Sequence, residues 1–404
     1  MKILVMNAGS SSQKSCLYEL TEDILPTEPP EPLWEAHIDW TIEVGFAVGK
    51  IKANGVKLET KLETSDRGFV LSKMLETLTN GATKVIEKLS EIDIVGHRVV
   101  HGGTEYSQAT RITSQVKDEI ARFSSLAPAH NPANLGGIEA IENILGDIPQ
   151  LAVFDTAFHS QIPSPAAVYP IPYQWLDKGV RRYGFHGISH QYCSHRVAQL
   201  LDKPLDSLRI ITCHLGNGCS LAAVKNGRSI DTTMGFTPLE GLMMGSRSGS
   251  IDPGILIYLM REYDFNADQL DKMLNKESGL KGVSGLSADM RTILAALDSN
   301  KQAKLAFESY IHQLRSLIGS MLASLGGLDV LAFTAGVGEN ASLLREKACE
   351  GWDFLGLQLD IEKNNSSPQD VDIAAADSAV RIFVIQAQED WAIAKECWKY
   401  FSEQ

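Results

Sequence analysis

The chain carries one local pattern twice: a short apolar run, typical of a buried strand, leads into a turn of glycine and small polar residues. The first copy joins residues 2–6 to the turn 7–14, and the second joins residues 210–213 to the turn 214–220. Small residues let backbone N–H groups approach an anion closely, and Lys14 adds a positive charge in the first turn. One copy alone would indicate an ordinary turn. Two copies, about 200 residues apart, favour a chain that binds a nucleotide.

Length and composition agree with two globular domains. The chain has 404 residues, of which 44% are hydrophobic and 22% are charged, and this length is more than one core usually supports. Apolar spacing predicts a helix over residues 304–325, ended by Gly326, and strands at residues 94–103, 151–155, 330–334 and 381–385. The pair Asn226-Gly227, between two further strand-like runs, favours a tight hairpin. Because strands and helices alternate along the chain, we expect an α/β fold of two similar halves with a cleft between them.

Charge and cysteine spacing exclude several classes of protein. A net charge of -13 argues against binding to nucleic acid or to an anionic membrane, because both attract a basic surface. The chain has no run of 18 apolar residues, and Met1 leads into a strand-like segment and not into a signal peptide. Its six cysteines form no C-x-x-C pair, so neither zinc nor disulfides are indicated. We therefore expect a cytoplasmic protein with reduced thiols.

Polar side chains gather in the middle of the chain. Eight of the ten histidines fall between His97 and His214. The H-x-x-x-H spacings among them lack the glutamate of H-E-x-x-H sites, so they do not indicate zinc. Residues 181–190 mix cations, an aromatic residue and glycines without periodicity, which is typical of a site loop. In residues 245–254, Arg247 stands among glycines and serines, where a guanidinium could bind a phosphoryl group.

A late glycine motif supports a rival interpretation. Residues 335–340 follow a predicted strand and are expected to form a third glycine turn. Residues 336–341 also fit the G-x-G-x-x-G/A pattern of dinucleotide sites and precede Asp360 by about 20 residues, as that fingerprint requires. Alone, the motif would indicate an NAD-binding oxidoreductase, but that function leaves the two earlier turns unexplained. The S-x-x-K pattern at residues 11–14 lacks the partner motifs of serine acyl enzymes. A third possibility is a nucleotide-binding regulatory protein without turnover.

Taken together, seven motifs in order make the chain resemble the acetate kinase family, part of the actin-like and sugar-kinase superfamily. The motifs lie at residues 7–12, 96–103, 154–159, 181–186, 214–218, 245–254 and 333–340. The resemblance implies two duplicated βββαβαβα domains of the RNase H-like, actin-like type, in a homodimer. Residues 1–150 plus 386–404 would form the acyl and metal side, and residues 151–385 the nucleotide-binding domain.

The resemblance also implies a reaction. The family transfers the γ-phosphoryl group of ATP to acetate in a direct in-line step, reversibly and with Mg²⁺ or Mn²⁺, giving acetyl phosphate and ADP. A propionate kinase or a broader short-chain acyl kinase is the alternative within the family. Because an acetate carboxylate is already ionised at pH 7, no general base is needed to make it a nucleophile.

Site residues carry over from the matching motifs, residue by residue. As catalytic residues the resemblance implies Arg98, His130, Asp155, His186 and Arg247. It assigns the acyl pocket to Arg98, Val100, Ala129, Phe185 and Pro238, and the metal to Asn7 and Glu389. The nucleotide would be held by Lys14, His214, Leu215, Gly216, Asn217, Gly218, Asp289, Met290, Arg291, Gly336, Val337, Gly338, Glu339 and Asn340.

Some of these assignments carry specific expectations. Arg98 and Arg247 would bind the acyl carboxylate and the moving phosphoryl group, so alanine at either position should abolish nearly all activity and leave the chain folded. Asp155 would orient Mg²⁺ or an arginine. Ala129 stands where the family usually has leucine, and the space gained should admit propionate, at roughly 0.8 kcal/mol per buried methylene. Further departures from the family are Ser250, commonly aspartate, and Ala387 with Gln388, usually Thr-Asn.

Overall fold

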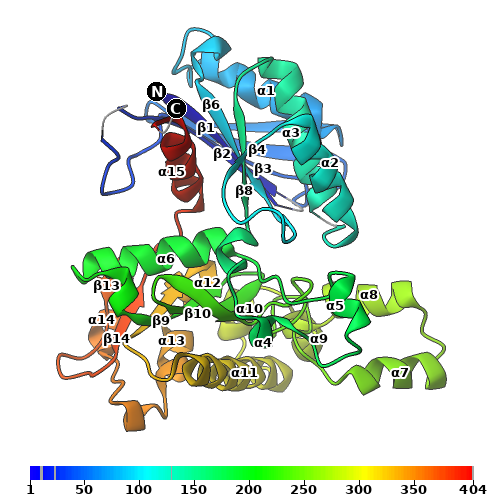
Figure 1. The fold of residues 1–404 in the computed structure, drawn as a ribbon, viewed down its shortest axis with the longest axis vertical. Coiled ribbons are helices and arrows are strands. Elements are labelled where there is room, and N and C mark those ends of the chain that lie inside the picture. The colour runs from blue at the N-terminus through cyan, green and yellow to red at the C-terminus, as the bar shows by residue number, and fades with distance from the viewer. Residues whose placement is uncertain (10–11, 22–23, 129, 403–404) are drawn as a thin grey trace. The chain divides into compact units, whose positions relative to one another are not determined.

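The computed structural model describes residues 1–9, 12–21, 24–128 and 130–402, which divide into two compact units (Figure 1). The first unit comprises Met1–Ala157 and Gln388–Gln404, and the second comprises Phe158–Ala387. The first boundary lies later than the expected 150/151, because β8 (Gln150–Phe154) pairs with β6 (Ile94–Val99) and so belongs to the first unit. The second boundary lies at 387/388 and not at 385/386.

One mixed sheet forms the first unit, with the strand order β5-β4-β3-β2-β1-β6-β8-β7. Strand β1 runs antiparallel to β2 and parallel to β6, and β6 runs parallel to β8. The remaining bounds are β1 Lys2–Ala8, β2 Ser12–Glu19, β3 Trp34–Asp39, β4 Phe46–Ala53, β5 Val56–Glu63 and β7 Thr110–Arg111.

Helices pack on both faces of this sheet. On one face, Val70 of α1 and Ile141 of α3 share a core with Leu4 of β1. On the other face, Ile393 of α15 fills the space beside Gly96 of β6, where a Cβ would lie 2.6 Å from the isoleucine. Burying one such aliphatic side chain is worth about 1.5–3 kcal/mol. The helix bounds are α1 Arg67–Thr79, α2 Ser114–Arg122, α3 Asn131–Leu145 and α15 Glu389–Ser402.

The second unit has a mixed sheet with the order β11-β10-β9-β12-β14-β13. Strands β9, β10 and β11 are antiparallel neighbours, and β12 runs parallel to both β9 and β14. Asn226 and Gly227 join β10 to β11 with φ values of 53° and 73°, the left-handed pair that a tight hairpin requires. The bounds are β9 Arg209–Leu215, β10 Cys219–Lys225, β11 Arg228–Thr232, β12 Val330–Thr334, β13 Val371–Asp372 and β14 Arg381–Val384.

The helix predicted at residues 304–325 is confirmed as α11 (Lys301–Leu325), which Asn300 caps at its start and Gly326 at its end. The Asn300 side chain accepts from two backbone N–H groups of the first turn, and Gly326 takes a φ of 69° that suits glycine. The other helices of this unit are α4 Ser164–Ala167, α5 Gln174–Asp177, α6 Gly187–Leu200, α7 Pro253–Glu262, α8 Ala267–Lys276, α9 Gly279–Ser284, α10 Met290–Ala295, α12 Ala335–Asn340, α13 Ser342–Cys349 and α14 Ile361–Asn365.

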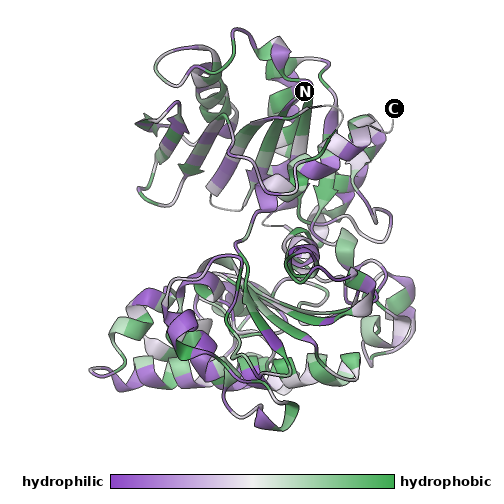
Figure 2. Cartoon of the chain, turned by 90° about the vertical axis from the view of Figure 1, so that its left-hand side faces the viewer, coloured by the Kyte–Doolittle hydropathy of each residue, from purple (hydrophilic) through white to green (hydrophobic). Residues whose placement is uncertain are grey.

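The two sheets contain the same arrangement of five strands. The order β3-β2-β1-β6-β8 in the first unit matches β11-β10-β9-β12-β14 in the second, with the same parallel and antiparallel neighbours. The central strands β9 and β12 are buried and mostly hydrophobic (Figure 2). The expected duplication within an α/β fold is therefore confirmed.

The helices that follow each five-strand set are exchanged between the units. Helix α6, which comes after β8 in the chain, packs on β9 and β12. Helix α15, which comes after β14, packs on β1 and β6. Residues 388–404 belong to the first unit for this reason.

The third glycine segment differs from its prediction. Residues 336–340 were expected to form a turn, but α12 (Ala335–Asn340) begins directly after β12. Ala335 has a φ of 65°, a left-handed conformation that strains a residue with a Cβ and that redirects the chain from strand to helix at once.

Within the described ranges, no helix combines the length and apolar character needed to cross a bilayer. The six cysteines are buried free thiols.

Candidate active site

In the first unit, Arg98 and Asp155 form an ion pair at the ends of two parallel strands. Arg98 lies near the end of β6, and Asp155 directly follows β8. The guanidinium donates two hydrogen bonds to Asp155 Oδ2, one from Nη2 and one of 3.0 Å from Nε. The side chains of Arg98 and Asp155 are 15% and 2% exposed. The pairing fixes the guanidinium while part of its surface stays open to a ligand.

Burial and neighbouring charges shift the pKa values of both members of this pair. Burial works against the charge of Arg98, but Asp155 and Glu389 outweigh it and raise the pKa of Arg98 above its usual value. Burial also raises the pKa of Asp155, and Arg98 opposes that rise. Both hydrogen bonds from Arg98 end on Oδ2 of Asp155, so this oxygen holds the guanidinium in place.

A second acidic group adjoins this pair. The Asn7 side chain, on β1, donates from Nδ2 to Glu389 Oε2 at 3.3 Å and to Asp390 Oδ1 at 2.7 Å. Burial raises the pKa of Asp390, Asn7 and Lys14 lower it, and Glu389 raises it again. The structure thus brings the two predicted metal ligands together and adds Asp390, which the sequence analysis left out of the site.

Much of the first predicted turn, at residues 7–14, lies on strands. Strand β2 begins at Ser12, so Lys14 lies on a strand opposite Asn7 and not within the turn. Its side chain is exposed and close enough to lower the pKa of Asp390. Lys14 therefore lies near the acidic residues of the first unit. Its contact with a nucleotide stays a prediction.

Backbone near the predicted acyl pocket is held by asparagines of α3. The Val100 amide donates to Asn134 Oδ1 at 3.2 Å, and the His101 amide to Asn131 Oδ1 at 3.1 Å. His130 immediately precedes α3, and its carbonyl accepts from the Asn134 amide at 2.9 Å. Val100 is buried. Ala129 lies outside the described residues.

In the second unit, His186 stands in a strained position at the start of α6. Its φ of 57° is left-handed, a conformation that costs about 1–3 kcal/mol in a non-glycine residue and is often found at functional sites. His186 Nδ1 hydrogen-bonds Ser220 Oγ at 2.8 Å, and its ring stacks on His214 with centroids 4.1 Å apart. Ser220 also bonds His190 Nε2 at 2.7 Å. These contacts turn Nε2 of His186 away from the core toward the Gly218 turn, since a Cβ on Gly218 would lie 3.5 Å from it.

Arg247 reaches the same turn. Its Nη1 also lies 3.5 Å from the position of a Gly218 Cβ, and it donates to the Pro238 carbonyl at 3.1 Å. Burial lowers the pKa of Arg247. Among the described residues, no carboxylate forms an ion pair with Arg247, whereas Arg98 has Asp155. A largely buried guanidinium without a counter-charge is typical of a site for an anionic ligand.

The predicted nucleotide-binding segments of this unit converge. The Gly245 amide donates to the Asn217 carbonyl at 3.1 Å. A Cβ on Gly245 would lie 2.9 Å from the Ala288 carbonyl, next to Asp289, and one on Gly338 would lie 3.7 Å from Leu215. The turn at residues 216–218, the loop at 245, the start of α10 and the start of α12 thus lie together.

The individual side chains of these segments differ in accessibility. Asp289 caps α10 by accepting from the Arg291 amide at 2.9 Å, and it pairs with the Arg291 guanidinium, which is 90% exposed. Met290 is buried in the core. Asn340 donates to the Gly336 carbonyl at 2.9 Å, and Glu339 accepts from a backbone amide. Gly336, Asn217 and Asn340 are exposed, and His214, Leu215, Gly338 and Phe185 are buried.

In the dinucleotide-binding interpretation, Asp360 would bind the ribose, but the structure gives this side chain another role. Asp360 caps α14, where Oδ1 accepts from the Lys363 amide at 3.1 Å and Oδ2 lies 3.6 Å from Lys363 Nζ. Asp360 thus serves as the N-cap of α14, a structural role that accounts for this carboxylate without a ribose.

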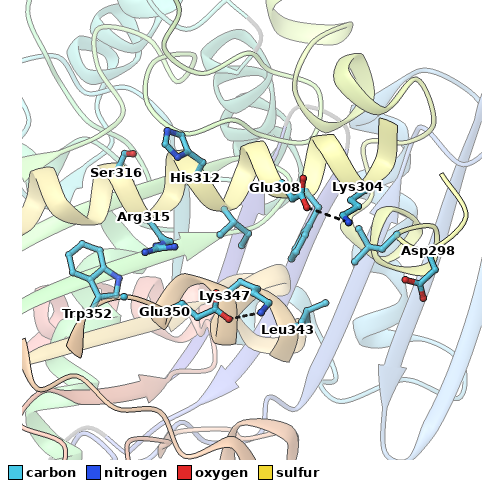
Figure 3. A pocket seen from close by; sticks show the side chains of 14 residues that line it. Asp298, Lys304, Glu308, His312, Arg315, Ser316, Leu343, Lys347, Glu350 and Trp352 are labelled. Atoms are coloured by element: carbon cyan, nitrogen blue, oxygen red, sulfur yellow. Dashed lines mark hydrogen bonds and ion pairs between the residues drawn. The ribbon is translucent and has the colours of Figure 1, made fainter. Parts of the chain in front are cut away.

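A separate pocket of about 720 Å³ lies in the second unit between α11 and α13 (Figure 3). Its charged side chains include two ion pairs, Lys304 with Glu308 and Lys347 with Glu350. None of its described lining residues belongs to the predicted site.

Comparison with known proteins decides the family. A family model for the acetokinase family matches residues 2–395. The chain belongs to the acetokinase family. An acetate kinase of Rippkaea orientalis is 65% identical to this acetokinase over 404 residues, which is 100% of both chains.

Solved structures agree with this acetokinase in fold. The crystal structure of Porphyromonas gingivalis acetate kinase matches with a TM-score of 0.91 and 39% identity, covering 99% of each chain. A propionate kinase from Francisella tularensis matches with a TM-score of 0.88 and 37% identity, covering 98% of each chain.

Proposed function

We propose that this acetokinase phosphorylates acetate with ATP, reversibly, giving acetyl phosphate and ADP. The proposal is supported by relatives named acetate kinase at 65% identity. The observation that carries it is the convergence of Arg247, without a carboxylate partner, and His186 on the Gly218 turn. Two fixed donors aimed at one point suit the equatorial oxygens of a phosphoryl group in transfer.

The transfer itself needs little covalent chemistry from the protein. An acetate oxygen attacks the γ-phosphorus, the bond from that phosphorus to the bridging oxygen of ADP breaks, and ADP leaves with the electron pair. No proton moves, because acetate is ionised at pH 7. The protein's part is to align the two oxygens in line and to stabilise the spread charge.

Each proposed catalytic residue has a part in that alignment. Arg98, held by Asp155, would orient the acetate carboxylate. Arg247 and His186 would stabilise the phosphoryl oxygens, with His186 fixed through Ser220. His130, at the start of α3, would assist. The first unit would thus bind the acyl group and the metal, and the second unit the nucleotide.

The acidic group of the first unit fits a divalent cation. Asn7, Glu389 and Asp390 offer carboxylate and amide oxygens, which are the ligands that Mg²⁺ and Mn²⁺ prefer. Glu389 raises the pKa of both Asp155 and Asp390. Its negative charge therefore repels the charges of these two carboxylates. When bound, Mg²⁺ would neutralise charge on the nucleotide phosphates.

The reverse reaction tests the proposed function. Purified chain supplied with acetyl phosphate, ADP and Mg²⁺ is expected to form ATP, detected with luciferase. EDTA should stop ATP formation, and added Mg²⁺ or Mn²⁺ should restore it. ATP formation that persists in excess EDTA would contradict the metal requirement.

Substrate breadth is tested at Ala129. We propose that this alanine, in place of the family's leucine, allows appreciable propionate turnover, and one of the similar solved structures is named a propionate kinase. Ala129→Leu is expected to lower kcat/KM for propionate about tenfold relative to acetate, since the pocket loses room for roughly one methylene. The measurement compares both acids in wild type and variant. An unchanged ratio would show that Ala129 does not set specificity.

Helix α7 supports a homodimer. It is rich in apolar residues, yet none of its residues is buried, and Ile257 and Tyr258 are 49% and 55% exposed. Apolar surface of this kind is commonly covered by a second copy in soluble oligomers. We expect wild type to sediment as a dimer at micromolar concentration and Tyr258→Glu to sediment as a monomer, because the charge would be buried at the interface. A monomeric wild type would refute the proposal.

A further inference from the structure

We propose that Arg182, Glu240 and Tyr169 form a clamp that positions His186 and Arg247 for phosphoryl transfer. The proposal rests on the proposed function, because it gives these three residues a part in the same reaction. None of them is among the site residues that the resemblance implies, although Arg182 lies in the predicted site loop at residues 181–190. The clamp joins the segment that carries His186 to the loop that supports Arg247.

Arg182 grips the backbone of the loop at residues 232–240. Its Nη1 lies 3.1 Å from three successive carbonyl oxygens, those of Thr232, Thr233 and Met234. Its Nη2 donates to Glu240 Oε1 at 2.7 Å. A planar guanidinium can serve these acceptors at once, which a lysine ammonium cannot do in the same geometry.

Tyr169 closes the clamp from the other side. Its hydroxyl donates to Glu240 Oε2 and accepts from the Phe236 amide at 2.8 Å. Burial and the bond to Glu240 raise the pKa of Tyr169 above its usual value, so the hydroxyl keeps its proton. The enclosed space is full: a Cβ on Gly235 would lie 1.7 Å from Glu240 Oε2 and 2.0 Å from the Tyr169 oxygen.

The clamp is tied to His186 through the segment at residues 182–186. The amides of Tyr183 and Gly184 donate to the Gly235 carbonyl at 3.0 and 3.3 Å. Gly184 has a φ of 77°, and a Cβ there would lie 2.7 Å from His159 and from Thr232. Close packing and hydrogen bonds therefore hold the backbone of residues 182–186 against the loop, and this fixes the position of His186.

The clamp is tied to Arg247 through Pro238. This residue lies within the gripped loop, and its carbonyl accepts from Arg247 Nη1 at 3.1 Å. A shift of the loop would move that acceptor and with it the guanidinium. Since both Arg247 and His186 point at the Gly218 turn, the clamp sets their separation as well as their directions.

The first test is Arg182→Lys, which keeps the charge and loses the planar fork. Misplacing catalytic groups by about 1 Å can cost on the order of a hundredfold in rate, so kcat is expected to fall 10- to 100-fold, while KM for ATP stays within about twofold. The matched control is Arg209→Lys, since Arg209 also holds a carboxylate with a fork, Asp329 at 3.0 and 2.7 Å, at the start of β9. An Arg182→Lys variant with the kcat of this control would overturn the clamp.

A double-mutant cycle separates positioning from general loss of folded protein. If Arg182 acts through Arg247, adding Arg182→Lys to Arg247→Lys should lower kcat much less than it does in wild type. If the two losses multiply in full, Arg182 has only a structural role. Tyr169→Phe removes only the hydroxyl. It should likewise lower kcat much less in the Arg247→Lys background than in wild type. An inactive wild type would refute the proposed function, whereas an active wild type with additive losses would refute the clamp alone.

Discussion

Arg247→Ala is expected to lower kcat for acetyl phosphate formation by about a hundredfold or more and to leave the free energy of unfolding unchanged or higher. Removing one preorganised donor to a developing charge costs about 2.7–4 kcal/mol of barrier. Stability should not suffer, because Arg247 pairs with no carboxylate among the described residues and burial already lowers its pKa. Steady-state kinetics and urea unfolding measure the two effects.

Arg228→Ala is the control for this variant, because Arg228 is exposed on β11 of the same unit. It should match wild type in both measurements. An Arg247→Ala variant that kept wild-type kcat would remove Arg247 from the reaction. A marked loss of stability would show that the packing of Arg247 and its hydrogen bond to the Pro238 carbonyl outweigh the cost of burying its charge.

Arg98→Ala is expected to abolish activity and also to destabilise the first unit. Its removal leaves Asp155 buried, 2% exposed, without its partner, and breaking a buried ion pair from one side costs about 3–5 kcal/mol. Urea unfolding is followed by tryptophan fluorescence in a background with Trp175→Phe and Trp352→Phe, so that the signal comes from the first unit, where Trp34 and Trp391 are buried.

The double variant with Arg98→Ala and Asp155→Ala separates the two losses. Without the uncompensated carboxylate, much of the lost stability should return, while activity should stay absent. Arg122→Ala, which breaks two largely exposed ion pairs in the same unit, with Glu105 and Glu119, should cost about 1 kcal/mol. Equal unfolding midpoints for wild type and Arg98→Ala would contradict the account of this pair.

These two arginines show where the sequence was informative and where it was not. Both were expected to leave a folded chain when replaced, and the structure revises that expectation for Arg98 only. The difference lies in Asp155, which follows a different strand. Asp155 was expected to orient Mg²⁺ or an arginine, but local spacing gave no sign that the pair would be buried.

The fold was largely predictable because its signals are local. Apolar runs and turn glycines predicted the central strands, the hairpin at Asn226 and the long helix ended by Gly326. The repeated strand and turn predicted the duplication. The glycine segment at α12 was missed because Ala335 takes a left-handed conformation that nothing in its side chain indicates.

Matching motifs predicted the residues of the candidate site, but they did not predict the contacts that support those residues. Ser220 joins His186 to His190, and Arg182 binds Glu240, between residues far apart in the chain. Asp390 follows Glu389 at the start of α15. Its place next to a predicted metal ligand was not by itself a reason to include it in the site. Such partners emerge only when the sheet order is known.

The central claim is that this chain transfers a phosphoryl group from ATP to acetate. Hydroxylamine trapping of acyl phosphate, with Mg²⁺ and ATP and with acetate, propionate or butyrate side by side, tests it most directly. The account predicts hydroxamate from acetate, a smaller but measurable amount from propionate, and little from butyrate. Absence of hydroxamate with all three acids, from protein that is folded and binds ATP, would contradict the kinase and favour a nucleotide-binding protein without turnover.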